Sequence, residues 1–218
     1  MWFLCKKPDM HLVVCGMETS KKELLAHELS EGLILEWTED PAVAARLQAD
    51  GFVDLCFESD LQRIKEWSKI KDRPVLLSSV TATLTGFPPN MIRFNGWHGF
   101  LGRKIIEASA SEKNKSIGAE IFSHFHRAVE WIPDVVGFVS ARVICMIINE
   151  AFFALAEKLS TREEIDIAMK LGTNYPYGPF EWCERIGAKH VYELLAELAR
   201  SEPRYQPAPL LQVEARNT

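Results

Sequence analysis

Four polar residues have side chains suited to acid–base chemistry: Ser78, Ser79, His98 and Glu107. An imidazole that is oriented by a carboxylate can take a proton from a hydroxyl group, and a further donor can hydrogen-bond to the same oxygen. His98 lies in a turn of glycine and aromatic residues, which is equally typical of a structural histidine. Taken alone, Glu107 is an ordinary acid at the end of a strand.

The other histidines form no second candidate site. His124 and His126 lie two positions apart on a predicted helix, so their side chains point to different sides. No further ligand follows at metal-binding spacing. We therefore interpret both as surface residues and predict no metal site. His11, His27 and His190 stand alone in the sequence.

Strand and helix patterns alternate through the first part of the chain. Apolar runs rich in branched residues predict strands at Met10–Gly16, Leu33–Glu36, Phe52–Phe57 and Pro74–Ser78. Helical patterns lie between them at 21–29, capped by Thr19 or Ser20, at 41–51, closed by Gly51, and at 60–70. This alternation predicts an α/β domain with a parallel sheet, whose ligands bind at the carboxyl ends of the strands.

The turn after the first strand decides whether such a sheet can hold a dinucleotide. A complete turn has the pattern G-x-G-x-x-G, which lets backbone N–H groups approach the pyrophosphate. Here the turn runs from Gly16 to Lys21 with one glycine, and Glu18 places a negative charge where a phosphate would lie. Glu36, at the end of the second strand, is either an acid for a ribose hydroxyl or a solvated acid near a helix N-terminus.

Helical patterns dominate the last third of the chain. An apolar helix is predicted over 140–159, with Arg142 near its start pairing with a strand-end carboxylate or carbonyl group. Ser160 and Glu163 predict a capping box for a second helix, which ends at Gly172. The apolar face of the first helix is more than a small bundle covers by itself, which predicts a homodimer through these helices. This face consists of Ile144, Ile147, Ile148, Phe152 and Leu155.

The motifs of this region resemble the C-terminal domain of the 3-hydroxyacyl-CoA dehydrogenases. The matching residues are Gly137-Phe138, Arg142, Glu150-Ala151, Glu164 to Asp166, Ala168 to Gly172, Tyr175-Pro176 through Glu181, and Tyr205 to Leu210. The resemblance implies a shortened, Rossmann-like parallel-sheet domain over residues 1–134. It also implies an all-α dimerisation domain over residues 135–218.

The resemblance also implies roles for the four polar residues suited to acid–base chemistry. His98 would be the base, Glu107 its orienting partner, and Ser78 the donor to the substrate oxygen, with Ser79 a near equivalent. Ala141 occupies the position at which the family has an asparagine. The implied cofactor is NAD, held at Gly16 and Glu36 with weak or lost affinity.

The implied substrate is a short-chain 3-hydroxyacyl-CoA, which the enzyme would oxidise to the 3-ketoacyl-CoA. The family has a longer helical segment after the second strand that helps to hold CoA, and this chain lacks it. The alternative is a non-catalytic relative that keeps the fold and the dimer and binds an acyl thioester or a partner protein.

Composition excludes some classes of partner. A net charge of -5 argues against nucleic acid. No apolar run is long enough to cross a bilayer, and the start, Met1 to Lys7, does not have the pattern of a signal peptide. The five cysteines are scattered and odd in number, which is typical of reduced thiols. We therefore predict a cytoplasmic protein.

Overall fold

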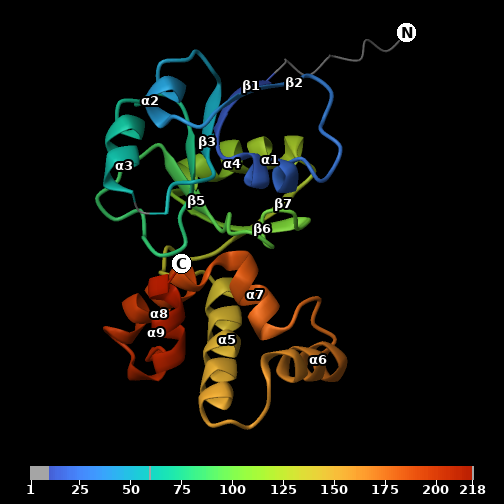
Figure 1. The fold of residues 1–218 in the computed structure, drawn as a ribbon. Coiled ribbons are helices and arrows are strands. Elements are labelled where there is room, and N and C mark those ends of the chain that lie inside the picture. Colours follow the sequence, from blue (N-terminus) through green and yellow to red (C-terminus); the bar gives the residue numbers. More distant parts are fainter. Residues whose placement is uncertain (1–9, 59, 218) are drawn as a thin grey trace. The chain divides into compact units, whose positions relative to one another are not determined.

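The computed structural model describes residues 10–58 and 60–217, which form two compact units. The first unit runs to Gly96 and resumes over Phe100–Asp134, and the second contains Trp97–Gly99 and the chain from Val135 onward. Figure 1 shows strands with flanking helices in the first unit and helices in the second. The predictions about the start of the chain and Cys5 lie outside the described residues. In the described part, no helix has both the length and the apolar character needed to span a membrane.

Seven strands of the first unit form one sheet, in the order β2-β1-β3-β4-β5-β6-β7. Neighbouring strands are parallel except β5 and β6, which are antiparallel. The strands are β1 (Met10–Cys15), β2 (Leu33–Thr38), β3 (Gly51–Asp54), β4 (Val75–Ser78), β5 (Met91–Phe94), β6 (Ile105–Ala110) and β7 (Ala128–Trp131). The predicted α/β class is confirmed, and β5 and β7 are strands that the sequence did not predict.

Helices cover both faces of this sheet (Figure 1). The bounds are α1 (Glu18–Leu24), α2 (Pro41–Ala44), α3 (Leu61–Trp67) and α4 (Glu112–His124). One apolar cluster joins the sheet to Leu24 of α1 and to Ile121 and Phe122 of α4. A second cluster joins the opposite face to Ala44 of α2 and Trp67 of α3. Burial on both faces explains why the strand patterns in the sequence are continuous apolar runs.

Two helices of this unit differ from the prediction. The helix after β1 begins at Glu18, with Met17 as its N-cap, so the predicted caps at Thr19 and Ser20 are wrong. α2 has one turn, capped by the Asp40 carboxylate, which accepts a hydrogen bond from the Ala42 amide at 2.7 Å. Gly51, predicted to close that helix, is instead the first residue of β3.

The third strand is also shorter than predicted, and Asp54 at its end gives the reason. The Asp54 carboxylate is fully buried. It accepts hydrogen bonds from Arg63 Nε at 2.8 Å, Trp67 Nε1 at 2.5 Å and the Cys56 amide at 2.9 Å. A buried carboxylate requires such partners, and the bond to its own chain turns the backbone out of the sheet after Asp54.

The interpretation of His124 and His126 is correct for only one of them. His124 ends α4 and is buried, with 2% of its surface exposed, so its assignment to the surface is wrong. His126 is exposed and lies beyond the helix, in a left-handed conformation with φ of 54°. The helix ends earlier than the sequence pattern suggests because the chain turns sharply into β7.

The second unit consists of helices, which Figure 1 shows in yellow to red. They are α5 (Ser140–Ala156), α6 (Arg162–Thr173), α7 (Pro179–Ile186), α8 (Ala188–Ala199), the short 3-10 helix η1 (Pro203–Tyr205) and α9 (Pro209–Asn217). Arg142 near the start of α5 donates from Nε to the Val136 carbonyl oxygen at 2.7 Å. The predicted pairing with a carbonyl group is therefore correct, although Val136 lies in a loop.

The predicted apolar face of α5 is largely covered within its own unit. Ile144, Ile148 and Phe152 are buried, because α7, α8 and α9 contact this helix. The Phe152 ring meets the Phe180 ring of α7 edge to face at 5.1 Å. The other two residues of this face, Ile147 and Leu155, are half-buried, and Val143, one turn before Ile147, is exposed. The homodimer through these helices stays a prediction.

The ends of α6 also differ from the prediction. Its capping box is formed by Thr161 and Glu164, one position after the predicted pair. At the other end the helix continues through Gly172 and stops at Asn174, which has a left-handed φ of 56°. Asparagine adopts this conformation more readily than most residues, so it can end a helix as glycine does.

A buried carboxylate of α6 fixes the beginning of α7. Asp166 accepts hydrogen bonds from the Phe180 amide at 2.8 Å and the Glu181 amide at 3.2 Å. These amides belong to the first turn of α7 and have no partner within the helix. Gly178 precedes that turn, and a Cβ atom there would lie 2.3 Å from the Asp166 carboxyl group. The contact between α6 and α7 therefore requires both Asp166 and Gly178.

We expect Gly178→Ala to lower the free energy of unfolding by about 2 kcal/mol, because the added methyl group displaces the Asp166 carboxylate. Gly172→Ala is the matched control, since a Cβ atom there meets nothing within 4 Å. This control should raise stability by about 0.5 to 1 kcal/mol through helix propensity. Urea unfolding followed by circular dichroism measures both variants, and equal stabilities would contradict the role of Gly178.

Candidate functional site

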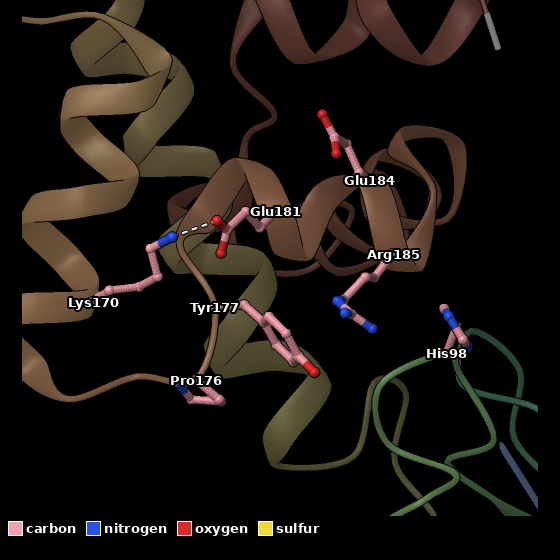
Figure 2. A pocket seen from close by; sticks show the side chains of 7 residues that line it. All are labelled: His98, Lys170, Pro176, Tyr177, Glu181, Glu184 and Arg185. Carbon is pink, nitrogen blue, oxygen red and sulfur yellow. Dashed lines mark hydrogen bonds and ion pairs between the residues drawn. The ribbon is translucent and has the colours of Figure 1, made fainter.

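A polar pocket of the helical unit contains the candidate base. Its cavity of about 660 Å³ is lined by His98, Lys170, Pro176, Tyr177, Glu181, Glu184 and Arg185. Figure 2 shows these side chains around the space between α6, α7 and the segment of His98. The sequence predicted His98 and missed the rest of the lining, although Lys170 and the stretch from Pro176 to Glu181 belong to the motifs of the resemblance.

Charged pairs and aromatic contacts hold the lining in place. Lys170 of α6 donates to the Glu181 carboxylate, which also accepts from the Gly178 amide at 2.9 Å. These hydrogen bonds, with that of Lys170 the larger effect, lower the pKa of Glu181. The Arg185 guanidinium lies over the Tyr177 ring, 3.8 Å from its centroid. The pocket therefore holds a fixed carboxylate and a cation supported by an aromatic ring.

The turn that carries His98 is fixed by its two neighbours. Gly99 has a φ of 89°, and a Cβ atom there would lie 2.5 Å from the Trp182 ring. The Trp97 ring stacks on His190 of α8, with 6.0 Å between centroids. Burial lowers the pKa of His190, so this ring is neutral at physiological pH. These contacts hold Trp97–Gly99 in the helical unit while the His98 side chain remains exposed.

The structure distinguishes between the two candidate serines of the first unit. The Ser79 hydroxyl donates to the Ala82 carbonyl oxygen at 3.2 Å, so its proton is used within the protein. Ser78 ends β4, and its side chain faces Gly96, where a Cβ atom would lie 2.6 Å from the Ser78 hydroxyl oxygen. Gly96 thus leaves room for the Ser78 side chain. The role of Ser78 as a donor to substrate stays a prediction.

Glu107 and Ala141 occupy well-defined elements. Glu107 is the third residue of β6, not its end, and is half-buried beside Glu130 of β7 in the strand register. It belongs to the first unit, whereas His98 belongs to the second, so the pairing of these residues stays a prediction. Ala141 is completely buried in the first turn of α5. An alanine there supplies no polar group to a substrate.

The turn after β1 combines a closely packed glycine with an exposed carboxylate. A Cβ atom at Gly16 would lie 3.0 Å from Leu55, so the glycine permits close packing of the turn at the carboxyl end of β1. Glu18, however, is the exposed first residue of α1, and its carboxylate interacts with Lys21 at 3.9 Å. A carboxylate at this helix terminus opposes the approach of a pyrophosphate. The predicted weak or lost affinity for NAD stays a prediction.

Glu36 lies within β2, which continues for two residues beyond it. Its carboxylate pairs with the His11 imidazole at 3.5 Å. His11 is the second residue of β1, whereas Gly16 follows the last. The Glu36 side chain is thus directed along the sheet away from the glycine turn. Its interaction with a ribose stays a prediction.

Within residues 10–58 and 60–217, no three His, Cys, Asp or Glu side chains are grouped as metal ligands. The cysteines Cys15, Cys56, Cys145 and Cys183 are free thiols. Burial raises the pKa of Cys15 and of Cys183 to about 12, so both are protonated at neutral pH. These thiols pack in the interior and do not form part of the pocket.

Comparison with known proteins identifies the helical region. Residues 137–217 match the family described as 3-hydroxyacyl-CoA dehydrogenase, C-terminal domain. A probable 3-hydroxybutyryl-CoA dehydrogenase of Bacillus subtilis is 39% identical over 137 residues, which are 60% of this chain and 47% of that protein. The 3-hydroxyadipyl-CoA dehydrogenase of Escherichia coli is 41% identical over 91 residues, which are 41% of this chain and 19% of that protein. The chain thus spans less than half the length of these curated relatives.

Solved structures extend the likeness to the fold of nearly the whole chain. The (S)-3-hydroxybutyryl-CoA dehydrogenase of Ralstonia eutropha superposes with a TM-score of 0.73 at 17% identity. The superposition covers 97% of this chain and 94% of that one. At this identity the comparison shows a shared fold alone.

We expect Glu18→Gly to tighten the binding of NAD about tenfold, because it removes a like charge from the turn at which a pyrophosphate is predicted to lie. Glu31→Gly is the control, since it removes the same charge from an exposed position before β2. Titration calorimetry with NAD measures both affinities. An equal change in NAD affinity in the two variants would show that the affinity depends on the net charge of the protein and not on the position of Glu18.

Proposed function

We propose that the chain, whose residues 137–217 match the C-terminal domain of the 3-hydroxyacyl-CoA dehydrogenases, is an NAD-dependent oxidoreductase of this family acting on short-chain 3-hydroxyacyl-CoA. The observation that carries this proposal is the position of His98. It lines a polar pocket next to residues of the family motif, among them Lys170 and Glu181. The relatives named 3-hydroxybutyryl-CoA dehydrogenase support the choice of a short acyl chain.

In the proposed reaction, the substrate loses a proton from its 3-hydroxyl group and a hydride from carbon 3. His98 takes the proton, and Glu107 stabilises the resulting imidazolium. The Ser78 hydroxyl donates a hydrogen bond to the same oxygen as it becomes a carbonyl group. NAD, when bound at the turn of Gly16, supplies a nicotinamide ring that accepts the hydride. The products are the 3-ketoacyl-CoA, NADH and one proton.

We expect His98→Asn to lower kcat about 100-fold or more, because a general base of the oxidation, which acts as the general acid of the reduction, contributes this much to proton transfer. The assay follows NADH absorbance during the reduction of acetoacetyl-CoA. His126→Asn is the matched control: His126 is exposed, and asparagine tolerates its positive φ. The control should retain full activity.

Three further outcomes define the limits of the proposal. Equal and negligible rates of acetoacetyl-CoA reduction in the wild type and in His98→Asn would contradict the proposed dehydrogenase activity. If NAD and NADH also failed to bind in calorimetry, the alternative of a non-catalytic relative that binds an acyl thioester would stand. An unchanged rate in Glu107→Gln would remove Glu107 from the mechanism while leaving His98 as the base.

We further propose that a second copy of the chain covers the side of α5 that its own unit leaves open. Val139 and Val143 are 58% and 49% exposed there. They adjoin a shallow cavity of about 350 Å³ that includes Met146, Ile147 and Tyr205. Adjacent exposed apolar side chains of this kind are typical of a subunit interface.

We expect Val143→Glu to convert a dimer into a monomer, because a dimer interface would bury the new charge without a partner. Val43→Glu is the control, since Val43 is 44% exposed on α2 of the other unit. Analytical ultracentrifugation gives the mass of each variant. A wild type that sediments as a monomer would contradict the proposed dimer.

A further inference from the structure

The pocket of His98 contains a cation that rests on an aromatic ring. Arg185 lies in the last turn of α7, and among the described residues its guanidinium has no hydrogen bond or ion pair. Its contact is with the Tyr177 ring, which supports the guanidinium from one side. Figure 2 shows the Arg185 side chain extending toward the space between Tyr177 and His98. A guanidinium held in this way keeps its donors available for a ligand.

The other charged side chains of the pocket either form an ion pair with each other or extend away from Arg185. Lys170 and Glu181 form an ion pair, which Figure 2 draws as a dashed line. In the same view Glu184 extends away from Arg185, although the two are neighbours in sequence. The cation that is left to recognise a negatively charged group is therefore Arg185.

We propose that Arg185 binds a carboxylate at the far end of the acyl chain, so that the preferred substrate is a dicarboxylic 3-hydroxyacyl-CoA. This inference rests on the proposed function of the His98 pocket. A planar guanidinium matches a carboxylate with two parallel hydrogen bonds. Pro176 and Tyr177 line the same cavity and offer apolar surface to the methylene groups between the two ends.

The chemistry of the lining favours a carboxylate over a phosphate of CoA. Glu181 and Glu184 also line the pocket. Their charges oppose a phosphate group with two negative charges more strongly than a carboxylate with one. A carboxylate is matched by the single charge of Arg185, whereas a phosphate would bring a second negative charge that Arg185 alone does not offset.

A structural role for Arg185 is the main alternative. A cation in the last turn of a helix interacts favourably with the helix dipole, whatever ligand is present. This role would affect stability and would not distinguish one acyl chain from another. A comparison of ligands that differ only at the end of the chain separates the two roles.

The experiment measures the binding of adipyl-CoA and hexanoyl-CoA, two six-carbon acyl thioesters that differ in the terminal carboxylate. Titration calorimetry is carried out on the wild type, Arg185→Gln and Arg200→Gln. Arg200 is an exposed residue at the end of α8, so its variant makes the same change in net charge. We expect the wild type to bind adipyl-CoA about tenfold or more tighter than hexanoyl-CoA. Arg185→Gln should lose this preference, and Arg200→Gln should keep it.

Three results would overturn the inference. The wild type could bind both ligands equally, or Arg185→Gln could keep the preference. A similar loss of affinity for both ligands in Arg185→Gln would assign Arg185 to the CoA moiety instead. Because both ligands lack the 3-hydroxyl group, the result does not depend on turnover. Failure of the proposed dehydrogenase activity is therefore distinguishable from failure of this inference.

Discussion

The Asp166 carboxylate at the start of α7 is the interaction on which the helical unit's pocket depends. Its hydrogen bonds to the Phe180 and Glu181 amides join α6 to α7. This junction sets the side chain of Lys170, four residues after Asp166, within reach of Glu181. It also fixes the direction of α7, and hence the position of Arg185 one turn further along. A local capping contact thus arranges the charges of the whole cavity.

In the unit that contains the sheet, a different buried carboxylate joins a helix to the sheet. Asp54 binds Arg63 and Trp67 of α3 and ends β3 beside the end of β1. Removing two charges from water is costly, so this cluster is not explained by stability alone. It holds α3 at the carboxyl ends of the central strands. Gly16 directly follows Cys15, the register partner of Asp54, so the glycine turn lies beside this cluster.

The sequence predicted the helices and strands that are buried along their whole length. It was less successful at predicting where a helix or strand begins or ends when tertiary contacts determine that position. Continuous apolar runs identified β1 and β4, and the long apolar helix α5 was equally clear. The helical pattern after Pro41 suggested a long helix, but the chain leaves it after one turn because Gly51 must enter β3. Before α6, two overlapping capping boxes are possible, and the hydrogen bonds choose the one with Thr161 and Glu164. Spacing alone does not distinguish them.

In the candidate site, too, some residues can be recognised from the sequence and others only from their contacts in the structure. A histidine between glycines and aromatic residues can be recognised in the sequence, and His98 does line a pocket. Arg185 has no such signal, because a cation in the last turn of a helix is common. What distinguishes Arg185 is that its guanidinium rests on Tyr177 while the neighbouring carboxylates are engaged or point away. The proposed selectivity for a carboxylate therefore rests on the surroundings of Arg185, which the order of residues does not show.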